Sequence, residues 1–350
     1  MMALPPVHLQ GLATALPPHR ARQADVVAMA RELFKARGGD FERFKPVYDN
    51  AGVQERHLAV PLDWYAHPHG WAETSQRYVD AGCGLLEQAA RSALARSRLG
   101  VQDIDTIVTV STTGIATPSL DAHLVNRLRL RRDVERLPIF GLGCAGGVVG
   151  LSRGIALARS RPGTRVLVLV VELCGLTFRL SDQSNANIVA TALFGDGAAA
   201  AIVSTDADGP IFGPAGEYTW PDSLDVMGWR IEDDGFGVVF SRDIPVLVQT
   251  QLRSATETFL GVHGRTLADI DSFVCHPGGT KVVAALERAY GLPDNHLKHA
   301  RAVLARAGNM SAATVLFVLE SALEAGDGPR HMLTALGPGF TAAFLLMNSA

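Results

Sequence analysis

The second half of this 350-residue chain repeats the pattern of its first half. The segment Leu267-Ala-Asp-Ile-Asp-Ser-Phe-Val matches Val101-Gln-Asp-Ile-Asp-Thr-Ile-Val at an offset of 166 residues, and Gly308-Asn-Met-Ser matches Gly143-Cys-Ala-Gly at an offset of 165. Two nearly equal offsets predict an internal duplication, in which equivalent segments of the two halves meet near one centre. We expect the halves to span residues 1–205 and 206–350, because the stretch 205–245 is rich in glycine, proline and aspartate.

The composition is that of a globular protein and excludes two classes of partner. Hydrophobic residues make up 47% of the chain and charged residues 19%, with a formal net charge of -3. This balance provides no basic surface for a nucleic acid or an anionic lipid. The apolar run at 166–171 is too short to span a bilayer, and the proline-rich start does not resemble a signal peptide. We expect a cytoplasmic protein without stable membrane insertion.

The cysteines are widely separated, and none belongs to a C-x-x-C pair. Such spacing indicates neither a zinc site nor a disulfide framework, and it favours a reducing compartment. We therefore expect no bound metal. The four positions are Cys83, Cys144, Cys174 and Cys275.

Candidate strands and helices alternate along the chain, which predicts a layered α/β architecture. Polar, glycine-bearing loops follow the buried strands, where α/β folds place functional groups. We expect the stretch 205–245 to form a linker with a hairpin or a long loop. The expected strands are 7–16, 103–111, 137–140, 166–171 and 198–204, and the expected helices are 24–37, 73–98, 119–129, 146–161, 184–192 and 312–324.

One cysteine lies in an unusual setting. Cys144 is embedded in Gly-Leu-Gly-Cys-Ala-Gly-Gly-Val-Val-Gly, and the apolar spacing that follows predicts a buried helix starting beside it. The partial positive charge of a helix N-terminus lowers the pKa of a thiol, so this position suits a reactive thiolate. A small buried cysteine in a tightly packed turn is an equally good interpretation of this segment alone.

Two further side chains join Cys144 through the duplication. Asn309 occupies the position equivalent to Cys144 at the start of the matching helix, and His276 ends a strand just before Pro-Gly-Gly. Singly, Asn309 could be a helix cap and His276 a turn residue. Their joint placement on a duplicated scaffold favours one shared site.

These segments resemble those of type III polyketide synthases, the chalcone synthase-like group of the thiolase superfamily. The resemblance covers nearly the whole chain and implies a duplicated, thiolase-like αβαβα layered fold and a homodimer. A ketoacyl synthase III of fatty-acid synthesis also carries Cys, His and Asn, but His-Pro-Gly-Gly and Gly-Pro-Gly-Phe favour the polyketide synthase. The matched segments are Gly143-Cys144-Ala-Gly-Gly, Phe194-Gly-Asp-Gly, His276-Pro-Gly-Gly, Gly308-Asn309-Met-Ser and Gly337-Pro-Gly-Phe340.

The resemblance implies a role for each of the three side chains. Cys144 would carry the acyl group of a starter acyl-CoA as a thioester. His276 would sustain the thiolate and, with Asn309, donate hydrogen bonds to the thioester and enolate oxygens. Malonyl-CoA would supply the enolate by losing carbon dioxide, so acyl-CoA and malonyl-CoA are substrates and no cofactor is required. A catalytically silent homologue is disfavoured, because all three side chains are present.

Pocket and gate residues are also implied. Phe194 matches a gatekeeper phenylalanine between the acyl pocket and the CoA tunnel. A second gatekeeper falls at Val238, with Phe236 and Phe240 as replacements. Glu172, Cys174 and Thr177 match cavity positions, and Trp229 stands near a glycine of plant enzymes.

For CoA, the resemblance points to cations around 41–50. Arg43 and Lys45 remain there, although ordinary solvated charges explain them equally well. Lys281, Gly278 and Gly279 follow the catalytic histidine and complete the expected CoA contacts. The loop 112–118 matches one that reaches the partner subunit in relatives, except that Thr117 replaces their methionine.

The departures at Val238, Cys174 and Trp229 favour a medium- or long-chain fatty acyl-CoA starter and an alkylpyrone or alkylresorcinol product. The bulk of Trp229 supports an alternative, a malonyl-CoA-primed synthase that makes a tetrahydroxynaphthalene or phloroglucinol.

Overall fold

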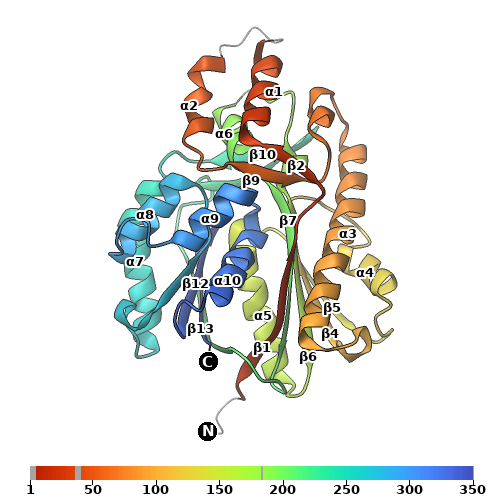
Figure 1. Ribbon diagram of the computed structural model, residues 1–350, viewed down its shortest axis with the longest axis vertical. Helices are drawn as coiled ribbons and strands as arrows, with labels where there is room; N and C mark the ends of the chain where they lie inside the picture. Colours follow the sequence, from red (N-terminus) through yellow and green to blue (C-terminus); the bar gives the residue numbers. More distant parts are fainter. Residues whose placement is uncertain (1–4, 36–40, 183, 350) are drawn as a thin grey trace.

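A computed structural model describes residues 5–35, 41–182 and 184–349 and contains one large mixed sheet (Figure 1). The sheet has nine strands in the order β11-β12-β13-β8-β1-β7-β6-β4-β5. Two short antiparallel strand pairs, β2–β3 and β9–β10, lie outside it. The strands are β1 (Val7–Ala15), β2 (His19–Arg22), β3 (Glu55–Leu58), β4 (Thr106–Val110), β5 (Glu135–Ile139), β6 (Arg165–Leu173), β7 (Asp196–Ser204), β8 (Ile211–Thr219), β9 (Met227–Glu232), β10 (Gly235–Phe240), β11 (Ser272–Cys275), β12 (Arg330–Gly337) and β13 (Thr341–Asn348).

The two ends of the sheet have the same strand plan. In the first half β4 is parallel to β6, β6 is antiparallel to β7, and β7 is antiparallel to β1. In the second half β11 is parallel to β12, β12 is antiparallel to β13, and β13 is antiparallel to β8. The duplicated thiolase-like fold expected from the sequence is therefore confirmed. Within the sheet, the two halves meet where β1 pairs with β8 through Val7–Phe212 and His8–Ile211. Residues 205–210 connect β7 to β8.

Helices form three layers around the two half-sheets (Figure 1). Helices α5 and α10 lie in the middle, between the strands of the two halves, while α3 with α4 and α7 with α8 cover the outer faces. None of the helices in the described part of the chain is long and apolar enough to cross a membrane. The helices are α1 (Gln23–Lys35), α2 (Lys45–Asp49), α3 (Trp71–Ser97), α4 (Leu120–Leu128), α5 (Gly146–Ser160), α6 (Asn185–Leu193), α7 (Ile244–Val262), α8 (Thr280–Tyr290), α9 (Lys298–Ala307) and α10 (Thr314–Ala325).

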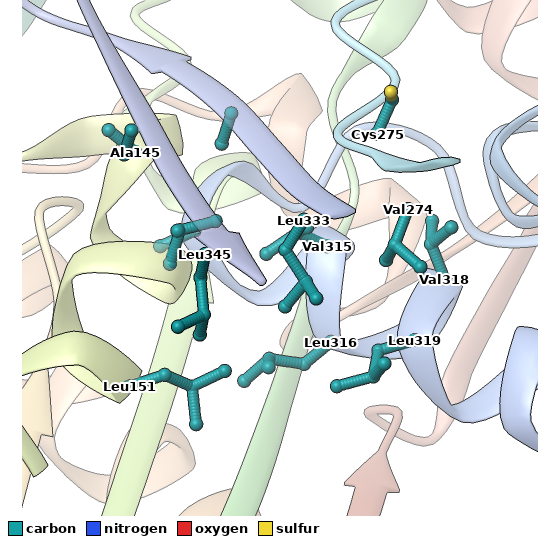
Figure 2. Packing of buried hydrophobic residues seen from close by; sticks show 14 of the residues in the cluster. Ala145, Leu151, Val274, Cys275, Val315, Leu316, Val318, Leu319, Leu333 and Leu345 are labelled. Atoms are coloured by element: carbon teal, nitrogen blue, oxygen red, sulfur yellow. The ribbon is translucent and has the colours of Figure 1, made fainter. Parts of the chain in front are cut away.

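Apolar side chains of the middle layer belong to an extensive buried cluster. Helix α10 is apolar almost all round because strands of the second half cover one side and α5 covers another. Figure 2 shows its side chains meeting residues of β11, β12 and β13. The labelled members are Ala145, Leu151, Val274, Cys275, Val315, Leu316, Val318, Leu319, Leu333 and Leu345.

The expected elements of the first half are present within a few residues, although positions 36–37 of the first helix lie outside the described residues. The region 205–245 differs from its prediction in one respect. It contains the expected hairpin, β9–β10, but also β8, a strand of the main sheet. Glycine and proline interrupt β8, and most of its residues remain partly exposed, so its sequence lacks the alternation that identifies a strand.

Candidate active site

The three candidate catalytic residues line one cavity. Cys144, His276 and Asn309 come from three segments far apart in the sequence, and all three border a space of about 570 Å³. The shared site expected from the duplication is therefore present in the structure.

Tight packing fixes the elbow that presents Cys144. A 3-10 turn, η4 (Gly143–Ala145), leads into α5. Gly143 has φ +45°, and a Cβ there would lie 2.6 Å from Cδ of Pro338. The amide of Gly143 donates to Oγ1 of Thr112 at 3.0 Å. Only glycine fits this position. The resulting turn places Cys144 immediately before the N-terminus of α5.

The second elbow, η7 (Ser311–Ala313) before α10, packs directly on the first. A Cβ on Gly147 would lie only 2.2 Å from the carbonyl oxygen of Ala312. This backbone-to-backbone approach brings the two helix starts together, as expected for equivalent parts of a duplicated fold.

Asn309 is held from both ends of its side-chain amide. Its Oδ1 accepts the backbone N–H of Ser311 at 2.8 Å, and its Nδ2 donates to the carbonyl of Gly278 at 3.4 Å. The Ser311 amide identifies which atom is the oxygen, since that position needs an acceptor. One N–H of the buried amide is left for a ligand in the cavity.

His276 is a buried, neutral imidazole. It follows β11, its backbone N–H donates to Thr334 at 2.8 Å, and the residue is 5% exposed. Neither ring nitrogen has a hydrogen-bond partner among the described residues. Burial lowers the pKa of His276 to about 3. The ring can therefore accept a proton or donate one only toward the cavity.

The thiol of Cys144 differs from its sequence-based expectation. Burial raises the pKa of the Cys144 thiol to about 12. A hydrogen bond with Ser311 acts in the opposite direction and lowers this pKa, whereas the charge of Glu172 raises it further. Desolvation therefore outweighs the hydrogen bond with Ser311. This direction is opposite to the lowering of the pKa that the sequence predicted for a thiol at a helix N-terminus.

Glu172 is connected to this thiol through Ser311. Its Oε2 accepts the amide of Thr112 at 3.0 Å, and its Oε1 accepts the hydroxyl of Ser311 at 3.5 Å. The carboxyl is fully buried, and burial raises its pKa to about 7. The sequence indicated Glu172 only as a cavity residue and missed Ser311; a glutamate at the end of an apolar strand was the available signal.

The gate residues form one buried cluster beside the cavity. Phe194, Cys174, Val238 and Ala190 pack together. Val238 is 5% exposed and does not border the cavity. Instead Phe240 borders it, 5.8 Å from Phe194 between ring centroids. Phe240, one of the two replacements considered above, therefore lies against Phe194 and borders the cavity, whereas Val238 packs in the buried cluster with Phe194.

The side chain of Trp229 packs against the same buried cluster. Its ring centroid lies 6.1 Å from that of Phe194 and 6.0 Å from that of Phe236. The rings of Phe240, Phe194, Trp229 and Phe236 thus form a continuous wall beside Cys174.

The cavity mouth carries positive charge. Arg43 and Lys281 border the cavity, as do Gly278 and Gly279. Lys45 does not border it, and its ammonium pairs with Asp49 at 2.6 Å. Arg242 also borders the cavity and was missed, although it directly precedes the α7 segment Asp-Ile-Pro. The described lining residues include no aspartate or glutamate. Such a mouth suits the phosphates of CoA.

A second, smaller cavity lies behind the gate. It measures about 120 Å³, is mostly apolar, and is bordered at one end by Cys174, Thr177 and Phe194. Helix α1 forms its other end through Met29 and Ala30. Within the described residues no group of three or more His, Cys, Asp or Glu side chains is arranged to hold a metal.

Comparisons with known proteins cover nearly all of the chain. The sequence profile of the N-terminal domain of chalcone and stilbene synthases matches residues 8–207, and that of their C-terminal domain matches residues 215–350. The chain is 41% identical over 344 residues to a 1,3,6,8-tetrahydroxynaphthalene synthase of Streptomyces peucetius subsp. caesius, covering 96% of this chain and 91% of the relative. It is 36% identical over 354 residues to a putative chalcone synthase of Bacillus subtilis, covering 96% and 97%.

The crystal structure of 1,3,6,8-tetrahydroxynaphthalene synthase from Streptomyces coelicolor A3(2), a bacterial type III polyketide synthase, superposes with a TM-score of 0.93. The identity is 26%, with 98% of this chain and 99% of that one covered. Together with the profile matches, these likenesses show that the chain is an acyltransferase-type enzyme that belongs to the chalcone and stilbene synthase family of type III polyketide synthases.

Proposed function

We propose that this type III polyketide synthase loads an acyl group from CoA onto Cys144 and extends it with malonyl-CoA. The observation that supports this most directly is the meeting of Cys144, His276 and Asn309 in one cavity whose mouth carries three cations. CoA binding places its thioester near the thiol, because the phosphates remain with Arg43, Arg242 and Lys281.

Loading is an acyl transfer between two thiols. The sulfur of Cys144 attacks the thioester carbonyl while His276, a neutral imidazole, takes the thiol proton. Asn309 donates its remaining amide N–H to the carbonyl oxygen as negative charge develops on it. The C–S bond to CoA then breaks, and His276 returns the proton to the departing CoA thiolate.

Extension uses the same donors. Malonyl-CoA loses carbon dioxide, which leaves an enolate whose oxygen accepts hydrogen bonds from Asn309 and His276. The enolate carbon attacks the acyl thioester of Cys144, a C–C bond forms, and the cysteine sulfur leaves. An aspartate at 309 would repel both the malonyl carboxylate and the enolate.

For the starter we propose a medium- or long-chain fatty acyl-CoA, which gives an alkylpyrone or alkylresorcinol. The apolar cavity behind Cys174 and Phe194 supports this, since a tail that passes the gate could enter it. Each buried methylene contributes about 0.8 kcal/mol to binding. Rotation of the Phe194 side chain would join this cavity to the one at Cys144.

A malonyl-CoA-primed synthase is the second candidate. The ring of Trp229 packs against those of Phe194 and Phe236 and adds bulk to this side of the site, and the relative with 41% identity is a 1,3,6,8-tetrahydroxynaphthalene synthase. Such an enzyme would need no separate starter.

Two measurements separate the candidates. With a fatty starter, kcat/KM rises from acetyl-CoA to decanoyl-CoA; with a malonyl starter, malonyl-CoA alone gives efficient turnover, and mass spectrometry identifies the product. Ala30→Phe, which fills the far end of the smaller cavity, should lower kcat/KM for long starters only. Ala28→Phe on the exposed side of α1 is the matched control. A flat chain-length profile in both variants would reject the fatty starter.

We also propose a homodimer that works in the cytoplasm, where CoA thioesters are available. Strand β5 is an edge of the sheet, and the apolar residues near it are exposed: Ile115 is 50%, Leu137 36% and Phe140 54% accessible. An edge strand with apolar neighbours is a surface that a second copy can cover. The loop 112–118 lies beside it and would reach the partner.

A further inference from the structure

A buried arginine of β3 is bonded to the end of the helix that precedes the gate. Arg56 is 2% exposed, and its terminal nitrogens donate to the carbonyls of Thr191, Ala192 and Phe194 at 2.7, 2.8 and 2.7 Å. Carbonyls in the last turn of a helix lack partners within the helix. Gly195, which follows, does not adopt the left-handed conformation of a glycine cap. The guanidinium therefore caps α6 and holds the gate residue by its backbone.

The charge of Arg56 is directed at these carbonyls and not at an acid. Its other acceptor is the side-chain oxygen of Gln23, which is uncharged. The buried carboxylate of Asp196 accepts the amides of Ala59 and Gly175 at 2.7 and 2.6 Å, and no ion pair within the described part of the chain joins it to Arg56. Burial lowers the pKa of Arg56 to about 10, so the guanidinium stays charged at neutral pH. Its hydrogen bonds to the end of α6 are therefore charge-assisted and favoured by the helix dipole.

The segment fixed by this guanidinium is also paired with the backbone of Asn309. Phe194 and Asn309 form an isolated parallel β-bridge. The amide of Asn309 donates to the carbonyl of Leu193 at 2.8 Å, and the amide of Gly195 donates to the carbonyl of Asn309 at 3.1 Å. The two backbones lie in direct contact, because a Cβ on Gly308 would be only 2.8 Å from the carbonyl oxygen of Leu193. A displacement of the end of α6 would therefore move the backbone of Asn309.

We propose that Arg56 is a positioning residue for the condensation. By fixing the end of α6, it sets the backbone of Asn309 and hence the direction of the amide N–H that is left for a ligand. Arg56 itself does not border the cavity at Cys144. A misplacement of about 1 Å caused by a change far from the reacting atoms can cost about 100-fold in rate. The inference rests on the donor role proposed for Asn309, because that residue carries the effect to the substrate.

The test is a double-mutant cycle on malonyl-CoA decarboxylation by the full-length enzyme, followed as release of labelled carbon dioxide. Arg56→Lys keeps the charge but offers a single nitrogen in place of the two that hold the carbonyls. We expect kcat to fall by about 10- to 100-fold. The KM for malonyl-CoA should change little, because the cations at the mouth, Arg43, Arg242 and Lys281, are untouched. Once Asn309→Ala has removed the donor, Arg56→Lys should cause no further loss.

A purely structural role would give a different result. If Arg56→Lys only lowered the fraction of folded enzyme, its loss would multiply with that of Asn309→Ala. Gln23→Met removes the neutral acceptor of the guanidinium; it should give a smaller loss that is likewise absent in the Asn309→Ala background, and it replaces Arg56→Lys if that variant does not fold. Arg301→Lys is the matched control, because this partly buried arginine pairs with Glu287, and it should leave kcat unchanged.

A parental kcat in Arg56→Lys, or equal fold losses in the presence and absence of the Asn309 amide, would overturn the positioning role and leave the donor role of Asn309 intact. A raised KM with a parental kcat would also overturn it, since Arg56 would then act on substrate binding. A parental rate in Asn309→Ala itself would instead reject the donor role, and the positioning role with it.

Discussion

Replacing Glu172 with glutamine should make Cys144 a more reactive thiol. The ionised carboxylate raises the pKa of Cys144, and it acts through Ser311, which bonds to both groups. Two hydrogen bonds in series place the charge about 6 Å from the sulfur. At an effective dielectric constant of about 20, a unit charge at this distance contributes about 3 kcal/mol, or about two pKa units.

The effect of Glu172→Gln on the alkylation rate of Cys144 should depend on pH. The pKa of Glu172 is raised to about 7, so the carboxyl is mostly protonated below pH 7 and ionised above it. Parent and Glu172→Gln should therefore alkylate at similar rates at low pH. Above about pH 7 the variant should become faster, by on the order of 10- to 100-fold, because the thiolate fraction governs the rate.

The assay follows iodoacetamide labelling of Cys144 by peptide mass spectrometry from about pH 6 to about pH 10. Glu287→Gln is the matched control: this acid is also buried, but it raises the pKa of Cys275 instead. Labelling of Cys144 that is unchanged or slower in Glu172→Gln would refute the electrostatic link through Ser311.

Three further changes test packing, chemistry and assembly. Gly147→Ala places a Cβ 2.2 Å from the Ala312 carbonyl oxygen and should lower the free energy of unfolding, measured by denaturant titration, by about 1–3 kcal/mol. Its control is Gly84→Ala, which places a Cβ in open space on α3 and should raise the free energy of unfolding by about 0.5–1 kcal/mol. Asn309→Asp should slow malonyl-CoA decarboxylation about 100- to 1,000-fold, and a parental rate of carbon dioxide release would contradict its donor role. Phe140→Asp should yield monomers in light scattering, because it places a charge on the exposed apolar face at β5.

Sequence reasoning grouped Cys144, His276 and Asn309, which line one cavity in the structure, because the duplication carries spatial information. Equivalent helix starts in two related halves must meet near the approximate symmetry axis, so Cys144 and Asn309 could be paired without coordinates. His276 could be assigned to the same site because it ends a predicted strand of the second half. Backbone geometry was thus predictable at these positions, since it depends on local glycine patterns and on the repeat itself.

Properties set by distant side chains were not predictable in this way. The raised pKa of Cys144 depends on how completely other elements bury its sulfur. The surroundings of Phe194 depend on how β9–β10 folds back, which places Phe240 at the cavity and Val238 in the buried cluster beside Phe194. Strand β8 was missed because its hydrogen bonds to β13, and not its own pattern, hold it in the sheet.

The neutral state of the site also explains how it can be buried before substrate arrives. Burying a thiolate–imidazolium pair would cost the desolvation free energy of two charges, whereas burying a neutral thiol and a neutral imidazole avoids this cost. In the proposed mechanism negative charge develops on the thioester or enolate oxygen, and the Asn309 amide is already held by Ser311 and Gly278 before the substrate binds. A donor that need not reorganise as this charge develops would lower the barrier of the proposed step.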